Sequence, residues 1–122
     1  MEKVQIIARF LLDDNGMPRF VEQDNRKHYR IELRVEGASP DTYAVNYQLH
    51  ETYYDPIREV HDSQTQFAET FTSYGDFTVQ AQLRNKTRVE VLTTMLSDAL
   101  KRGHDDPPSP SVAMALKNIR GN

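Results

Sequence analysis

The sequence contains no cysteine among its 122 residues, which excludes a disulfide framework, a thiolate nucleophile and a cysteine zinc site. It has only 5 glycines and no glycine-rich loop of the kind that binds phosphate groups. No serine lies in the G-x-S-x-G elbow of serine hydrolases, and the 4 histidines are scattered, without a pair at metal-ligand spacing. We therefore expect a protein that is not an enzyme and that holds neither a metal nor a cofactor.

A long apolar run is also missing, and residues 1–10 resemble neither a signal peptide nor a membrane span. The net charge is -3, with both signs interspersed. Proteins that bind nucleic acid usually carry a basic stripe, and the nearest candidate, Arg84 to Arg88, is short. We expect an intracellular protein, cytoplasmic if its source is prokaryotic, that binds neither nucleic acid nor membranes.

What the sequence does contain is a series of short segments in which apolar and polar residues alternate. This period of two is typical of half-buried strands. The segments are 3–12, 19–21, 29–35, 43–49, 57–60, 67–71 and 77–83. The turn cluster at 37–41 predicts that the third and fourth segments pair with each other. Together the segments predict an antiparallel β-sandwich in a chain long enough for one core.

The pattern changes after Arg84, where apolar residues fall at helical spacing. The apolar positions are Val89, Leu92, Leu96, Ala99 and Leu100. With a capping box at 87–90 and Gly103 as a stop signal, they predict a helix from about Arg88 to Arg102. A second helix is expected over 111–120. We thus predict a sandwich domain over 1–86 and a helical extension over 87–122, packed on the sandwich or projecting from it.

Two polar turns, 49–56 and 73–77, carry aromatic residues outside the alternating core pattern. Tyr53 and Tyr54 are adjacent, so on an extended backbone at most one of them can join the core. Tyr74 lies beside Gly75, which permits an unusual backbone conformation and close approach of another group. Two rings about 7 Å apart would hold a flat group such as an amide. The alternative is that these tyrosines only cover the edge of the core.

These two turns resemble the signatures of the YEATS family, readers of acylated lysine. The first signature, L-H followed by E-S/T-F/Y and a proline, stands here as L-H-E-T-Y at 49–53 with Pro56. The second, G-W/Y-G-E/A-F, stands here as S-Y-G-D-F at 73–77. Segment 28–37 is similar to the family strand H-x-W-x-V-x-V-x-G. The resemblance covers most of residues 4–84.

The resemblance implies an all-β, immunoglobulin-like antiparallel β-sandwich, here with one or two C-terminal α-helices, and an acyl-lysine slot at one end. The rings of Tyr53 and Tyr74 would sandwich the flat acyl-amide. The Thr52 hydroxyl would hydrogen-bond the amide, the Tyr74 backbone N–H would hold the acyl carbonyl, and His50 would support the slot. The implied ligand-binding residues are His50, Thr52, Tyr53, Ser73, Tyr74 and Gly75, with Tyr54 and Phe77 at the pocket rim.

Several positions depart from the family pattern. Ser73 replaces the usual glycine, and Tyr54 stands where eukaryotic members tend to have proline or a small residue. Asn25 and Arg26 occupy the region where a further aromatic residue is expected, and the tail after Thr87 is helical in pattern. These departures are typical of a prokaryotic or divergent member, whose ligand need not be a histone.

The partner implied by the resemblance is an acylated protein or peptide. A second hypothesis is an adaptor or assembly domain that keeps the fold and docks a larger complex through its surface and its C-terminal helix. The apolar face of that helix could pack on the sandwich or on another chain, and the sequence leaves both open.

Overall fold

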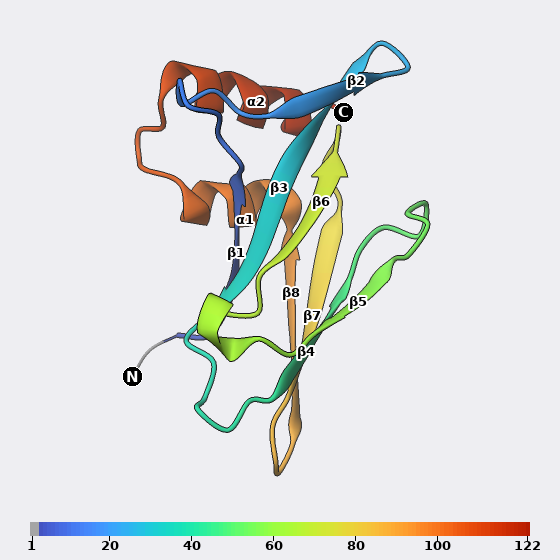
Figure 1. The fold of residues 1–122 in the computed structure, drawn as a ribbon, viewed down its shortest axis with the longest axis vertical. Helices are drawn as coiled ribbons and strands as arrows, with labels where there is room; N and C mark the ends of the chain where they lie inside the picture. Colours follow the sequence, from blue (N-terminus) through green and yellow to red (C-terminus); the bar gives the residue numbers. More distant parts are fainter. Residues whose placement is uncertain (1–2) are drawn as a thin grey trace.

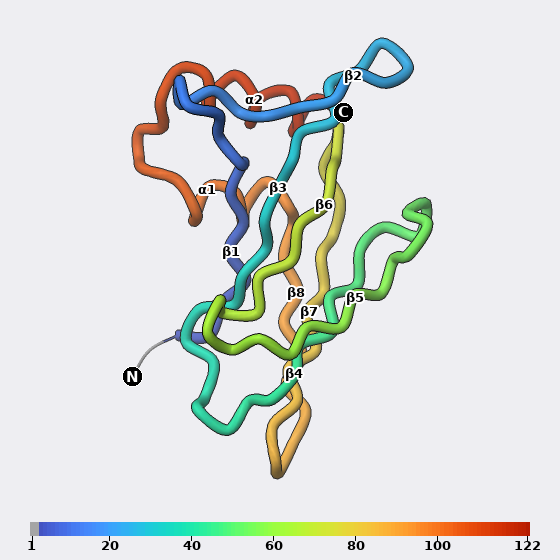
Figure 2. The backbone as a smooth tube through the Cα atoms, in the orientation of Figure 1, coloured from blue at the N-terminus to red at the C-terminus, as the bar shows by residue number. Residues whose placement is uncertain are grey.

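The protein is a two-layer β-sandwich with two helices against one side, as seen in a computed structural model that describes residues 3–122 (Figure 1). The backbone trace places the last residues of the chain beside the end of β6 (Figure 2). The strands are β1 (Gln5–Phe10), β2 (Phe20–Gln23), β3 (Arg26–Glu36), β4 (Ala44–Gln48), β5 (Ile57–Val60), β6 (Glu69–Ser73), β7 (Thr78–Arg84) and β8 (Val89–Met95). The helices are α1 (Leu96–Gly103) and α2 (Pro110–Arg120), and a single 3-10 turn, η1, covers Ser63–Thr65.

Two antiparallel sheets make up the sandwich. In the first sheet β3 is central, with β1 and β2 along one side and β6 along the other. In the second sheet the order is β5, β4, β7, β8. The predicted fold class, an antiparallel immunoglobulin-like sandwich with C-terminal helices, is confirmed.

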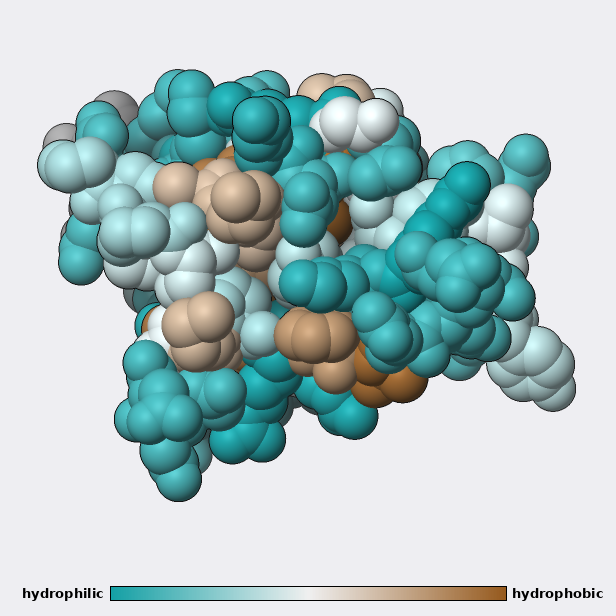
Figure 3. All heavy atoms as spheres, turned by 90° about the horizontal axis from the view of Figure 1, so that it is seen from above, coloured by the Kyte–Doolittle hydropathy of each residue, from teal (hydrophilic) through white to brown (hydrophobic). Residues whose placement is uncertain are grey.

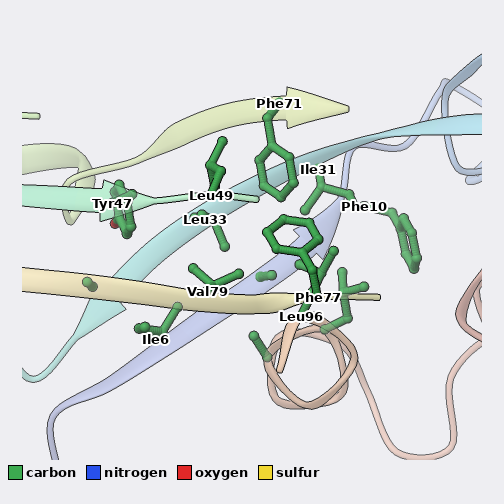
Figure 4. Packing of buried hydrophobic residues seen from close by; sticks show 14 of the residues in the cluster. Ile6, Phe10, Ile31, Leu33, Tyr47, Leu49, Phe71, Phe77, Val79 and Leu96 are labelled. Carbon is green, nitrogen blue, oxygen red and sulfur yellow. The ribbon is translucent and has the colours of Figure 1, made fainter. Parts of the chain in front are cut away.

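The core lies between the sheets and is filled by alternate residues of the strands. The buried side chains of β3 are Tyr29, Ile31, Leu33 and Val35, and those of β7 are Val79, Ala81 and Leu83. Figure 4 shows Phe71 and Phe77 meeting between the layers, with Leu49 close by. The alternation predicted for these segments is confirmed. It has a physical cause, because a fully buried aliphatic or aromatic side chain stabilises the fold by about 1.5–3 kcal/mol, and only the side chains that face the core are buried.

The predicted pairing of segments 29–35 and 43–49 is wrong. β3 and β4 lie in different sheets, and β4 pairs with β5 and β7 instead. The connection between them does not turn back as a hairpin, because Gly37 packs against the start of the chain. Its φ is 77°, and a Cβ built on it would lie 2.7 Å from the carbonyl oxygen of Lys3. The turn cluster therefore carries the chain across the sandwich.

The predicted helix from Arg88 to Arg102 is wrong in its first half. Residues Val89–Met95 form β8, which pairs with β7 along its whole length. The hairpin turn is closed by Asn85, whose side-chain oxygen accepts hydrogen bonds from the backbone N–H groups of Thr87 (3.1 Å) and Arg88 (2.9 Å). The helix begins only at Leu96, so that residues 87–122 include a strand of the sandwich.

Both helices pack in cis on the sandwich. α1 lies against β1, where a Cβ on Gly103 would come within 1.9 Å of the Ala8 carbonyl oxygen. The guanidinium of Arg102 donates to the Ile6 carbonyl at 2.7 Å. The second helix, α2, is confirmed, and it buries the expected face, with Val112, Ala115, Leu116 and Ile119. Neither described helix is long and apolar enough to cross a membrane.

Candidate functional site

The loop between β4 and β5 is a closed turn that presents His50 and Thr52. The Leu49 N–H donates to the Pro56 carbonyl at 2.7 Å, which closes the base of the loop. Inside it, the Thr52 backbone N–H donates to His50 Nδ1 at 3.2 Å. Since Nδ1 accepts this bond, its ring proton lies on Nε2, and the Thr52 hydroxyl, 2.9 Å away, also donates to Nδ1. The Thr52 oxygen therefore keeps its lone pairs free to accept a hydrogen bond.

Tyr53 turns from this loop toward the sandwich and is half-buried. Its hydroxyl donates to the Thr72 carbonyl of β6 at 2.5 Å. Its ring lies 5.9 Å from that of Phe71 and 5.7 Å from that of Phe77, centroid to centroid. Burial raises the pKa of Tyr53, and the nearby Ser73 hydroxyl and Arg58 charge partly offset this rise. Tyr53 thus ties the first loop to the end of β6.

Ser73, which stands where the family pattern has glycine, stabilises the second loop through its side chain. It is buried, its hydroxyl donates to the Gly75 carbonyl at 2.7 Å, and it accepts from the Gly75 N–H at 3.2 Å. This is a local side-chain turn of the kind that serine favours. The substitution is therefore accommodated by hydrogen bonding within the loop.

Asp76 fastens the same loop to helix α1. Its carboxylate accepts from the Ser97 backbone N–H at 2.9 Å and from the Ser97 hydroxyl at 2.7 Å. Met95, at the N-cap position of α1, makes no side-chain cap, so Asp76 caps this helix from a distant part of the chain. Gly75 lies against the last residue, since a Cβ there would be 3.0 Å from the Asn122 backbone oxygen. Sequence reasoning missed this role of Asp76, because nothing local links it to the helix.

Tyr74 points to the outer side of the sandwich and is 40% exposed. Its ring centroid lies 5.0 Å from that of His28 and 4.7 Å from the guanidinium carbon of Arg26. Both neighbours come from β3, where they alternate with the buried Tyr29. Sequence reasoning left His28 and Arg26 out of the site. The alternation in β3 was the available signal, because it places both on one outward face.

The remaining predicted residues occupy distinct positions. Tyr54, expected at the rim, is fully exposed in the β4–β5 loop. Phe77 is buried beneath the loops, and the His50 ring stands edge-on to it at 6.2 Å. The rings of Tyr53 and Tyr74 have separate neighbours, Phe71 and Phe77 on one side and His28 on the other. The aromatic slot, by which we mean the space between the Tyr53 and Tyr74 rings, stays a prediction.

The space-filling view from above shows this end of the molecule as mainly polar, with small apolar patches between polar side chains (Figure 3). Two cavities lie elsewhere. One of about 510 Å³ is formed by residues of α1, α2 and their linker, and one of about 270 Å³ lies between β1 and β8. Within residues 3–122, no group of three or more histidine, aspartate or glutamate side chains is placed to hold a metal ion. The chemistry available at the loops is hydrogen bonding and aromatic contact.

A sequence model of the prokaryotic YEATS domain matches residues 29–93, more than half of the chain. The chain belongs to the prokaryotic YEATS family. The match runs from β3 into β8 and includes both motif loops. The predicted division at residue 86 stays a prediction, although the family match continues past it. A search of curated proteins gives no significant match.

Several solved structures of YEATS domains have the same fold as this chain. The crystal structure of the yeast AF-9 homolog protein Yaf9 matches with a TM-score of 0.52 and 19% identity, over 75% of this chain and 65% of that one. The Yaf9 YEATS domain recognizing the H3K122suc peptide matches with a TM-score of 0.53 and 16% identity, over 79% and 77%. The Yaf9 YEATS domain bound to H3K27ac matches with a TM-score of 0.51 and 18% identity, over 79% and 76%. The chain spans just under two thirds of the first of these structures.

Proposed function

We propose that this YEATS domain is a non-enzymatic reader that binds acylated lysine on a protein partner inside the cell. The observation that carries the proposal is the convergence of the two motif loops at the end of β6. There the phenol of Tyr53, from the first loop, donates to the backbone carbonyl of Thr72 in β6, two residues before Tyr74 of the second loop. Thr52 lies in the same turn, next to Tyr53.

The polar groups of the loops complement an acyl-amide. Acylation removes the lysine charge and leaves a planar amide with one donor and one acceptor. The Thr52 oxygen is free to accept the amide N–H, because its own proton is donated to His50. The Tyr74 backbone N–H would donate to the acyl carbonyl, and the rings of Tyr53 and Tyr74 would contact the faces of the amide. A slot of this kind without a carboxylate would offer the buried ammonium of unmodified lysine no ion-pair partner.

The similar structures support the same chemistry. Two of the matching Yaf9 structures hold histone peptides with acylated lysine, one H3K122suc and one H3K27ac. For the present chain, the partner is proposed only as an acylated protein or peptide, since its departures at Ser73 and Tyr54 set it apart from the eukaryotic pattern.

The adaptor hypothesis has less support. It uses the surface of the domain and its C-terminal helix, but most apolar residues of both helices are buried against the sandwich, with Met114 of α2 as an exposed exception. The buried residues of α1 are Leu96, Ser97, Ala99 and Leu100.

A peptide titration tests the proposed function. One peptide sequence is prepared with unmodified, acetylated and crotonylated lysine and is titrated into isotope-labelled protein, with amide NMR shifts as the readout. We expect shifts in residues 49–56 and 73–77 with the acylated peptides alone. Tyr74→Ala should abolish them, whereas Tyr43→Ala, an exposed tyrosine at the far end of β4, should not. Equal shifts with the unmodified peptide would contradict the proposal.

A further inference from the structure

Arg26 places a positive charge directly on the proposed site. Its guanidinium carbon lies 4.7 Å from the centroid of the Tyr74 ring, in cation–π contact. Arg26 is the first residue of β3 and follows the β2–β3 hairpin turn, so it approaches Tyr74 from outside the two motif loops. The contact holds the planar guanidinium beside the ring, where the slot is expected.

This charge has no partner within the described part of the chain. The ion pairs among residues 3–122 are formed by Arg9, Arg34, Arg58, Arg84 and His61 with glutamates. Arg26 takes part in none of them, and its guanidinium donates no hydrogen bond to another described residue. Its N–H groups therefore remain available, and a guanidinium presents them in a fork that matches a carboxylate.

The nearby acidic residues do not neutralise Arg26. Asp76, in the loop of Tyr74, is occupied by Ser97 and by the Phe77 N–H. Asp24 lies in the hairpin turn and makes no ion pair with a described residue. Glu51, in the β4–β5 loop, is exposed and makes no ion pair with a described residue. The positive charge at Tyr74 is therefore left for a ligand.

We infer that Arg26 makes this site selective for lysine acylated with a group that ends in a carboxylate, such as succinyl or glutaryl, over uncharged acyl groups. The inference rests on the proposed function and names the ligand class of that same site. The acyl carbonyl would bind at Tyr74, and the terminal carboxylate would pair with the guanidinium stacked on the same ring. Because the guanidinium is already ordered by Tyr74, less side-chain entropy is lost when the ion pair forms.

The test compares two acyl groups of equal carbon count on one peptide. Succinyl-lysine and butyryl-lysine both have four acyl carbons, but only succinyl carries a charge. Affinities are measured by calorimetry for the wild type, for Arg26→Gln, and for Lys27→Gln as the matched control. Lys27 is the adjacent cation, but it lies over the Phe20 ring on the opposite face of the strand. Both positions are exposed, so both variants should fold.

We expect the wild type to bind the succinyl peptide about tenfold more tightly than the butyryl peptide, as one charge-assisted hydrogen-bonded pair allows. Arg26→Gln should remove this preference and change butyryl binding by less than about twofold. Lys27→Gln should keep the preference, and raising the salt concentration should reduce it.

Two outcomes overturn the inference while the proposed function stands. One is equal binding of both peptides by the wild type. The other is an equal loss in Arg26→Gln and Lys27→Gln, which would indicate general attraction by the hairpin. If neither acyl peptide binds better than the unmodified peptide, the proposed function fails, and the inference fails with it.

Discussion

Replacing Asp76 by alanine tests whether the second motif loop depends on helix α1. The carboxylate of Asp76 makes two hydrogen bonds to Ser97, at 2.9 Å to the backbone N–H and at 2.7 Å to the hydroxyl. Ser97 is buried, so neither donor can turn to water when the carboxylate is removed. The substitution should therefore destabilise the fold and not only the loop.

The magnitude follows from these bonds. Loss of a helix cap costs about 1 kcal/mol, and loss of a hydrogen bond to a charged group costs about 1.5–3 kcal/mol. The contributions overlap, so we expect Asp76→Ala to lower the free energy of unfolding by about 3 kcal/mol. For a chain of this length that corresponds to a fall in melting temperature of about 10 °C.

Urea denaturation followed by circular dichroism gives the free energy of unfolding directly. Ser97→Ala serves as the control, because it removes only the hydroxyl bond to the carboxylate and should cost about 1.5 kcal/mol, the low end of the range for such a bond. Asp76→Asn, which keeps one acceptor, should fall between the two. A loss below about 0.5 kcal/mol for Asp76→Ala would refute the reasoning, since it would mean that the cap contributes no stability.

Three further substitutions probe the packing of the sandwich and its helices. Tyr47→Phe removes the buried hydroxyl that donates to the Phe67 carbonyl at 2.6 Å, and urea denaturation should show a loss of about 1–2 kcal/mol. Burial lowers the pKa of His104 below its usual 6.5, so the folded chain binds fewer protons than the unfolded chain as the pH falls through that value. Stability should therefore decline below about pH 6.5, and His104→Gln should flatten the decline in thermal melts across pH. Gly103→Ala would place a Cβ within 1.9 Å of the Ala8 carbonyl oxygen, so little soluble folded protein is expected on expression, whereas Gly121→Ala should be tolerated.

The strands were the most predictable part of the fold, because their burial repeats every second residue. β3 shows this clearly, since its buried residues are those that the alternation selects. Which strands pair was less predictable. The turn at 37–41 has the composition of a hairpin turn. Gly37 instead adopts a positive φ and packs against the backbone of Lys3, and this tertiary contact leaves no signal in the local sequence.

The sequence of β8 fits both the spacing of apolar residues in a helix and the residue preferences of a strand. Val89, Leu92 and Leu96 are spaced for a helix, yet the β-branched residues between them, Val91, Thr93 and Thr94, favour a strand. The Asn85 turn and the ladder with β7 decide the outcome. Helix α1 can start at Leu96 because Asp76 caps it, and a cap from 21 residues away has no local signature.

The two motif loops lie together at the end of β6, but the motifs do not include all the residues that surround these loops. The pairing of β3 with β6 places Tyr29 opposite Ser73, which brings the outward face of β3 next to Tyr74. The register that buries Tyr29 therefore also sets Arg26 and His28 beside the exposed ring. Because Arg26 lies outside both signatures, a chain could keep them unchanged and still alter the charge at the site with one substitution. If the proposed function holds, ligand preference could thus change without any change in the residues that identify the family.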